Sequence, residues 1–200
     1  VEIGYQLFKA YGLQAFTGTN SMPTGNPGQF FDQQASSSPA NVTNNGYDGA
    51  LGIGFSLGWQ GQINDKLTLG ATYHSKNNMQ EFDDYKGLFA EKGDFDMPSW
   101  FGLGLSYKVS PKLTVAFDFT RTMYSDVDAI SNELVVSAPP GFPSGFNMFA
   151  PGTMLGDDKG SGFAWEDINV FKLGVAYEVN QNLVVRAGWS HGENPIDESQ

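Results

Sequence analysis

The chain has 200 residues, no cysteine and a net charge of −11 at neutral pH. The missing cysteines exclude a disulfide framework and a thiolate metal site. The charge argues against a nucleic-acid partner, because no basic patch is present to neutralise phosphates. No run approaches about eighteen apolar residues, so the sequence predicts no transmembrane helix.

In chain order, we expect a strand that begins near Val1 and then three hairpins of one repeated plan. The hairpins lie at residues 58–75, 104–121 and 174–191. Each has an alternating run, a tight polar turn and a second alternating run, which is typical of antiparallel β-structure. The chain therefore contributes about seven strands, too few for a closed single-chain membrane barrel.

The two faces of these strands differ in polarity. In the second hairpin, Leu103, Leu105 and Tyr107 alternate with Gly104 and Ser106. Side chains alternate between faces in a strand, so one face is continuously apolar and the other is wet. Aromatic residues lie near both ends of the apolar stripe, as in the interfacial girdles of membrane barrels: Trp59, Tyr107, Tyr177, Tyr73, Phe119 and Trp189.

The connections alternate in length. Long loops are expected at about residues 18–48, 81–97 and 125–164, and tight turns at about 64–65, 110–111 and 180–182. Long loops at one end and short turns at the other are typical of outer-membrane barrels, with extracellular loops and periplasmic turns. We predict an all-β fold, an antiparallel transmembrane β-barrel, with residues 1–200 in one barrel domain. A soluble β-sandwich stays open as an alternative.

Several segments resemble the FadL-type outer-membrane transport family. The most specific is the run Gly-Ser-Gly-Phe-Ala-Trp-Glu-Asp at 160–167. The others are residues 41–48, 52–55, 58–59, 67–73, 85–91, 93–98, 171–175 and 188–196. Each is weak alone, but their order and spacing are fairly specific.

The resemblance implies a monomeric barrel of about fourteen strands in the outer membrane of a Gram-negative bacterium. Such proteins take up long-chain fatty acids or other hydrophobic molecules, including aromatic hydrocarbons. They use no cofactor and no catalytic residue, and they contact membrane lipid and lipopolysaccharide. They also carry an N-terminal hatch and a lateral opening. We expect this chain to be an interior portion that lacks the hatch and the final strands.

The longest loop supplies the candidate ligand site. Apolar surface is usually avoided on a loop, whereas Met and Phe suit varied hydrophobic ligands. The alternative is a lid that packs only against its neighbours. The candidate capture residues are Val135, Phe142, Phe146, Met148, Phe149, Met154 and Leu155.

Four charged residues, Lys108, Asp118, Glu178 and Arg186, have the parity of the wet face and are expected to line the lumen. Lys108 or Arg186 could meet a ligand carboxylate. Alternatively, the four pair across strands and stiffen the wall.

Two other functions stay open. A general polar porin shares the fold but lacks so apolar a loop. A barrel-embedded lipid hydrolase would use His74 or His191, each beside a serine. Adjacent strand residues point to opposite faces, so neither pair forms its own catalytic dyad. No metal site is expected.

Overall fold

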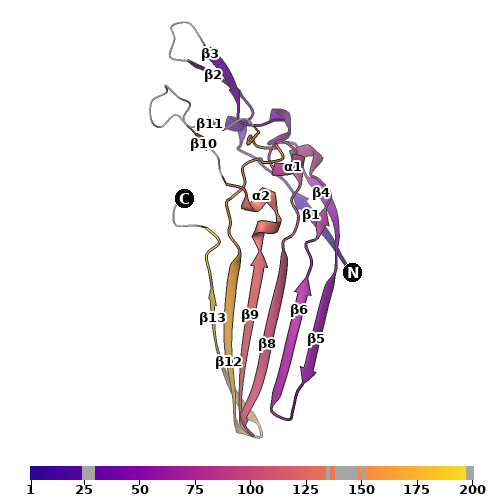
Figure 1. Ribbon diagram of the computed structural model, residues 1–200, viewed down its shortest axis with the longest axis vertical. Coiled ribbons are helices and arrows are strands. Elements are labelled where there is room, and N and C mark those ends of the chain that lie inside the picture. Colours follow the sequence, from indigo (N-terminus) through magenta and orange to yellow (C-terminus); the bar gives the residue numbers. More distant parts are fainter. Residues whose placement is uncertain (24–29, 134–135, 138–147, 150–151, 197–200) are drawn as a thin grey trace.

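A computed structural model describes residues 1–23, 30–133, 136–137, 148–149 and 152–196 (Figure 1). Its main feature is an antiparallel six-stranded sheet in the order β13-β12-β9-β8-β6-β5. The predicted all-β antiparallel fold is therefore confirmed. The strands of this sheet are β5 (Ser56–Gln62), β6 (Leu67–His74), β8 (Ser99–Ser110), β9 (Leu113–Met123), β12 (Ile168–Asn180) and β13 (Leu183–Gly192).

The same hydrogen bond closes the turn of each hairpin. The hairpins are β5–β6, β8–β9 and β12–β13. The side-chain oxygens of Asn64, Ser110 and Asn180 accept the backbone N–H two residues later, at 2.9, 3.2 and 2.9 Å. Asn and Ser favour turns for this reason, because their side chains substitute for a backbone acceptor. The three turns gather at one end of the sheet, and the longer connections lie at the other (Figure 1).

A second sheet extends the first toward the loop end. It contains β1 (Glu2–Phe8), β4 (Asp48–Gly54) and β7 (Asn78–Met79) in the order β1-β4-β7. Only Phe55 separates β4 from β5. Its N–H donates to Ser75 Oγ at 2.9 Å, and its carbonyl accepts the Ser75 N–H at 2.9 Å. These bonds maintain pairing across the break, so the two sheets form one continuous wall.

The remaining elements are short and lie in the loops. They are the strand pairs β2 (Thr19–Pro23) with β3 (Phe30–Gln34) and β10 (Val136–Ser137) with β11 (Met148–Phe149), the α-helices α1 (Ala90–Gly93) and α2 (Asp128–Ser131), and the 3-10 turns η1 (Gln14–Phe16), η2 (Pro39–Asn41), η3 (Asp83–Tyr85) and η4 (Tyr124–Asp126). No helix in the described residues is long and apolar enough to cross a bilayer.

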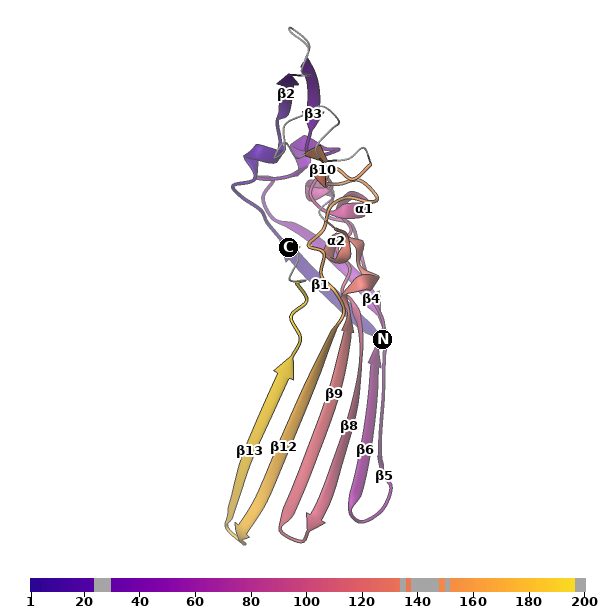
Figure 2. The same cartoon turned by 60° about the vertical axis from the view of Figure 1, so that its left-hand side comes forward.

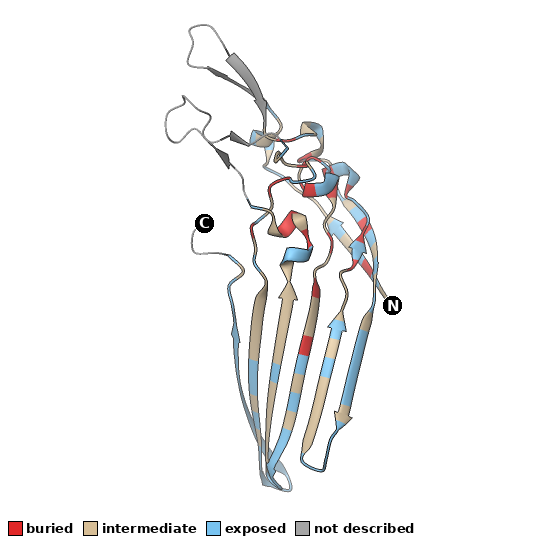
Figure 3. Ribbon diagram, in the orientation of Figure 1, coloured by how far each residue is buried: buried red, intermediate tan, exposed pale blue. Residues whose placement is uncertain are grey.

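The six-stranded sheet is a single layer (Figures 1 and 2). Within the described ranges no second sheet packs on it, unlike in a β-sandwich. Its apolar side chains are open: Leu103 is 52% exposed and Trp189 60%. Figure 3 shows the strands mostly exposed or intermediate. So much apolar surface on one face is expected of a wall that contacts lipid.

The buried core lies beyond the sheet, among the loops (Figure 3). We call it the loop core: Ala50, Met79, Phe82, Tyr85, Phe89, Ala90, Val127, Ala129 and Ile130. Tyr85 is fully buried and meets the Phe8 ring edge-on at 4.9 Å between centroids. Its hydroxyl donates to the Gly46 carbonyl at 2.7 Å and accepts the Ala10 N–H at 3.2 Å. This side chain thus joins two segments, η3 and the stretch before β4, to the end of β1.

The run at 160–167 fastens α2 to the start of β12. The Ile130 carbonyl accepts the N–H groups of Phe163 and Trp165 at 3.0 and 3.2 Å. The Trp165 ring meets Tyr124 edge-on, with centroids 5.2 Å apart. This motif therefore acts as a clasp over the loop core.

We predict that Tyr85→Ala loosens the loop core without opening the sheet. Removing a fully buried aromatic ring costs about 3–5 kcal/mol, and Tyr85→Phe, which loses only the hydroxyl bonds, costs about 1–2 kcal/mol. Amide hydrogen exchange of the folded protein in detergent would show faster exchange at residues 80–97 and 127–131. The exposed Tyr177→Ala serves as control. Unchanged exchange in Tyr85→Ala would contradict this account.

Candidate functional site

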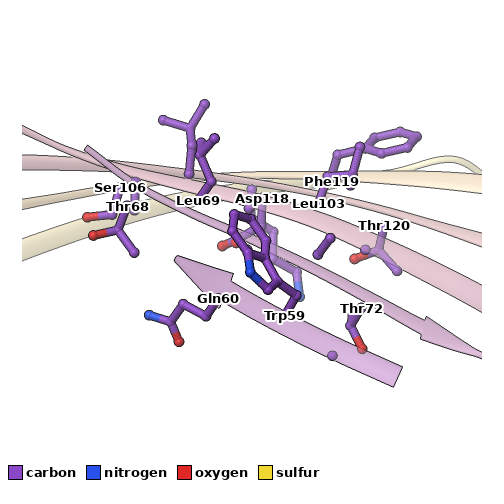
Figure 4. A pocket seen from close by; sticks show the side chains of 18 of the residues that line it. Trp59, Gln60, Thr68, Leu69, Thr72, Leu103, Ser106, Asp118, Phe119 and Thr120 are labelled. Atoms are coloured by element: carbon purple, nitrogen blue, oxygen red, sulfur yellow. The ribbon is translucent and has the colours of Figure 1, made fainter. Parts of the chain in front are cut away.

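The polar face of the six-stranded sheet forms the candidate channel lining. A recess of about 700 Å³ lies against it between β5 and β12 (Figure 4). In Figure 4, Thr68, Ser106 and Gln60 extend from one side of the ribbons, while Leu69 and Phe119 extend from the other. One cross-strand row through the recess contains Gln60, Gly70, Gly104, Asp118, Lys172 and Ser190.

Glycine sets the depth of the recess at this row. Gly104 pairs with Gly70 on one side and with Asp118 on the other. A Cβ at Gly104 would lie 2.6 Å from Asp118 Oδ1. The carboxylate therefore lies over the glycine, and a larger residue there would displace it.

The four predicted lumen charges do not face one another across the strands. Lys108 lies opposite Thr114, Glu178 opposite Val184, and Arg186 opposite Ala176. Asp118 lies opposite Gly104 and Lys172. Among the described residues, no ion pair joins two of the four. Their contact with a ligand stays a prediction.

Lys172, which the sequence reasoning missed, is the cation paired with Asp118 in the register of β12 and β9. The alternation placed Lys172 on the wet face, but its partner depends on the register between two hairpins.

A second missed group lies at the loop end of the polar face. His74 Nδ1 is 2.9 Å from Glu2 Oε1, and the His74 ring stacks on Trp100 with centroids 3.9 Å apart. These contacts link β1, β6 and β8. Ser56 is paired with His74 across β5 and β6, but no hydrogen bond joins the two side chains in the described part of the chain, so these residues form no Ser–His dyad there.

The structure reaches only part of the predicted capture loop. Val135, Phe142 and Phe146 lie outside the described residues. Met148 and Phe149 form β11, which pairs with Val136 and Ser137 of β10.

The other two capture residues lie where the loop meets the segment before η2. Met154 and Leu155 are half-buried. The Leu155 N–H donates to the Ala35 carbonyl at 3.0 Å, and its own carbonyl accepts the Ser37 N–H at 2.9 Å. The backbone of this part of the loop is therefore fixed.

Asp96 and Lys76 hold the 81–97 loop beside β7, and Asp94 lies two residues before Asp96 in the sequence. Asp96 is buried; it accepts the Met79 N–H at 2.6 Å and the Lys76 ammonium at 2.7 Å. Burial raises the pKa of Asp94 to about 7, and the negative charge of Asp96 adds to the rise. Asp94 Oδ1 is buried and has no partner in the described residues, so Asp94 is easier to bury protonated.

No cluster of His, Cys, Asp or Glu in the described residues could hold a metal ion.

Comparison with known protein families identifies the chain. A family model described as "Outer membrane protein transport protein (OMPP1/FadL/TodX)" matches residues 8–200. The chain belongs to this family. It is a family of transport proteins of the outer membrane, and not of enzymes. The predicted resemblance to FadL-type proteins is confirmed.

The chain is similar to several solved structures, and one of them reaches a TM-score that supports the same fold. A Pseudomonas aeruginosa FadL homologue is 16% identical, with a TM-score of 0.50, over 98% of this chain and 44% of its own. The P. putida toluene transporter TodX is 23% identical with a TM-score of 0.45, over 90% of this chain and 41% of its own. The Ralstonia pickettii toluene transporter TbuX is 20% identical with a TM-score of 0.44, over 74% and 37%.

The chain thus spans about two-fifths of the length of these structures, between 37% and 44%. No curated protein matches it.

We predict that the loop-end acid pair makes stability depend on pH. With its pKa raised, Asp94 binds a proton more tightly in the folded than in the unfolded protein. The free energy of unfolding should therefore fall as pH rises from about 4 to about 7 and level off above. Asp94→Asn removes this slope and is more stable than the original protein above pH 7.

Denaturant unfolding in detergent from pH 4 to 8 measures this effect. Asp65→Asn, at an exposed turn, is the charge-matched control and should keep the slope. A slope that survives in Asp94→Asn would disprove the assignment to Asp94.

Proposed function

We propose that this chain forms part of the wall of a passive channel that takes hydrophobic compounds, long-chain fatty acids or hydrocarbons, across the outer membrane of a Gram-negative bacterium. The match of residues 8–200 to the transport family is the observation that carries the proposal. The apolar outer face of the sheet supports it, because that face suits contact with lipid.

In this mechanism, ligands are captured on the loops, pass along the polar face and leave by diffusion, without nucleotide hydrolysis. The long loops face the outside and the lipopolysaccharide, and the tight turns face the periplasm. Residues 1–200 belong to a single, monomeric barrel. The capture residues are those of the longest loop, among them Phe146, Met148 and Phe149.

The polar lining favours one other candidate, a general porin. Gln60, Thr72 and Thr120 around the recess are polar, as in a water-filled pore. The two functions differ in what they carry: a porin conducts small ions freely and does not discriminate in favour of hydrophobic ligands.

We predict that Ser106→Trp slows uptake and that Leu105→Trp does not. Both residues border the recess and are neighbours in β8, but strand alternation points the Ser106 side chain to the polar face and the Leu105 side chain to the apolar face. Bulk at Ser106 narrows the lumen, whereas bulk at Leu105 meets lipid. We expect the initial uptake rate to fall about tenfold in Ser106→Trp, because the side chain obstructs the path. We expect it to fall less than about twofold in Leu105→Trp, because an apolar side chain replaces another on the lipid side.

Uptake of radiolabelled oleate and toluene by cells that express equal amounts of each full-length variant measures this. Ion conductance in planar bilayers distinguishes the porin. Equal uptake by both variants, or high conductance with no preference for hydrophobic solutes, would count against the proposal.

We also predict that the capture loop retains ligand during purification. Replacing Phe146, Met148 and Phe149 together by Ser removes the apolar contacts and should lower the co-purifying hydrophobic molecules several-fold, at about 1.5–3 kcal/mol for each buried apolar side chain. Mass spectrometry of extracts from the full-length protein measures them. Phe163→Ser, an exposed residue of the neighbouring clasp, is the control. If the triple variant and the original protein retain equal amounts of ligand, the capture site does not lie on this loop.

A further inference from the structure

A pocket of about 650 Å³ lies at the loop end, away from the recess on the sheet. Three segments surround it: residues 37–38, the stretch that includes Lys86 and Lys92, and residues 152–159. None of the capture residues predicted from the sequence lines it. Its lining combines three lysines with two serines, two glycines and two aspartates.

The backbone holds these segments together. The Lys92 N–H donates to the Gly156 carbonyl at 3.2 Å, and Ser36 Oγ donates to the Gly87 carbonyl at 2.6 Å. A Cβ at Gly156 would lie 2.4 Å from the Lys86 carbonyl oxygen, and its φ of +85° also favours glycine. The segments can approach this closely only because glycine occupies this position. Backbone contacts between these loop segments therefore hold the walls of the pocket in place.

The charges at the pocket are distinctive for this chain. Lys86, Lys92 and Lys159 come together there, three of the eleven basic residues in a protein of net charge −11. All three are exposed, and within the described residues none forms an ion pair. Three exposed ammonium groups around one pocket concentrate positive charge in an otherwise acidic protein, and such a local potential attracts anions.

The two aspartates at the pocket differ in their availability. Asp157 Oδ2 accepts the Met154 N–H at 3.0 Å, so this carboxylate is used to close its own turn. Asp158 is exposed and adds one negative charge at the rim. Asp157 keeps its negative charge, so the lining has three cations against two anions and is net positive in a strongly acidic protein, which favours an anionic ligand.

We propose that this pocket binds a phosphate monoester, with Lys86, Lys92 and Lys159 as its ligands. A phosphate monoester carries about −1.5 to −2 charges and three acceptor oxygens at neutral pH, which matches three point-charge donors better than a single carboxylate does. The hydroxyls of Ser37 and Ser38 at the same pocket already donate to the Leu155 carbonyl and to Asn41 Oδ1, at 3.1 and 2.9 Å, so the lysines are the donors left for the phosphate. A lipid headgroup is the expected source, and this source rests on the proposed outward orientation of the loops. The pocket's chemistry does not depend on it.

Direct binding to the purified full-length protein in uncharged detergent tests the site independently of transport. The probes are phosphatidic acid in mixed micelles, inorganic phosphate, and dodecanoate as a carboxylate. We expect phosphatidic acid to bind and Lys86→Gln/Lys159→Gln to weaken it about tenfold, as the loss of charge-assisted bonds predicts. Lys66→Gln/Lys112→Gln, at the opposite turns, changes the net charge equally and should stay within about twofold of the original protein.

Asp158→Asn supplies a test of opposite sign. This variant removes the negative charge at the rim, so it should bind phosphate more tightly. In the original protein, high salt should weaken phosphate binding. If inorganic phosphate binds with the same affinity as phosphatidic acid, the phosphate site is supported and its ligand is free phosphate.

Three results would overturn the proposal. Equal losses in both lysine double variants would show unspecific attraction. Weaker binding by Asp158→Asn would show a cation pocket. If dodecanoate binds at least as tightly as phosphatidic acid, the pocket recognises a carboxylate and not a phosphate. None of these results changes uptake of hydrophobic compounds, so the proposed transport function stands or falls separately.

Discussion

The hydrogen-bond register of the six-stranded sheet determines which side chains line the recess on its polar face. Because side chains alternate with a period of two, a shift of one residue would move polar groups onto the apolar face. The two register irregularities in the sheet fall between Lys108 and Ser110 and between Glu178 and Asn180. Both lie next to tight turns. The long runs between turn and loop end therefore keep one parity toward the polar face.

Since the sheet is one layer, the protein needs another place for a core. The loop end supplies it: Phe8 and Ala50 of the wall continue into a cluster with Phe82, Tyr85 and Phe89. This arrangement separates two tasks. The sheet provides two faces for two solvents, while the loop core fixes the segments at the proposed entrance. Asp96, which accepts the Met79 N–H of β7, and the clasp at 160–167 attach those segments to the wall.

The hairpins could be predicted from the sequence because they are local. Alternation, turn residues and spacing all lie within about twenty residues, and Asn64, Ser110 and Asn180 close the turns as their chemistry suggests. Contacts between distant segments could not. The pairing of Asp118 with Lys172 and the contact of Glu2 with His74 depend on which hairpins become neighbours. The lysine pocket was missed for the same reason, since its members come from separate loops.

For the predicted capture loop, the sequence supplied candidate residues but no geometry. Its composition identified a candidate, but composition specifies no geometry, and only Met154 and Leu155 among its residues have described side-chain surroundings. The sequence also placed four charges on the polar face without saying whether they meet. Alternation fixes a face, whereas pairing requires the register between strands that the chain does not join directly.

The edges of the sheet place a physical condition on the channel. In the described part of the chain, β13 pairs only with β12, and β5 only with β6. A bilayer core offers no water to satisfy the free N–H and C=O groups of an edge strand, so a membrane-spanning wall must be closed. The Pseudomonas aeruginosa FadL homologue is more than twice as long as the part of it that this chain matches. In the proposed channel, strands outside this sheet therefore form the wall opposite the recess.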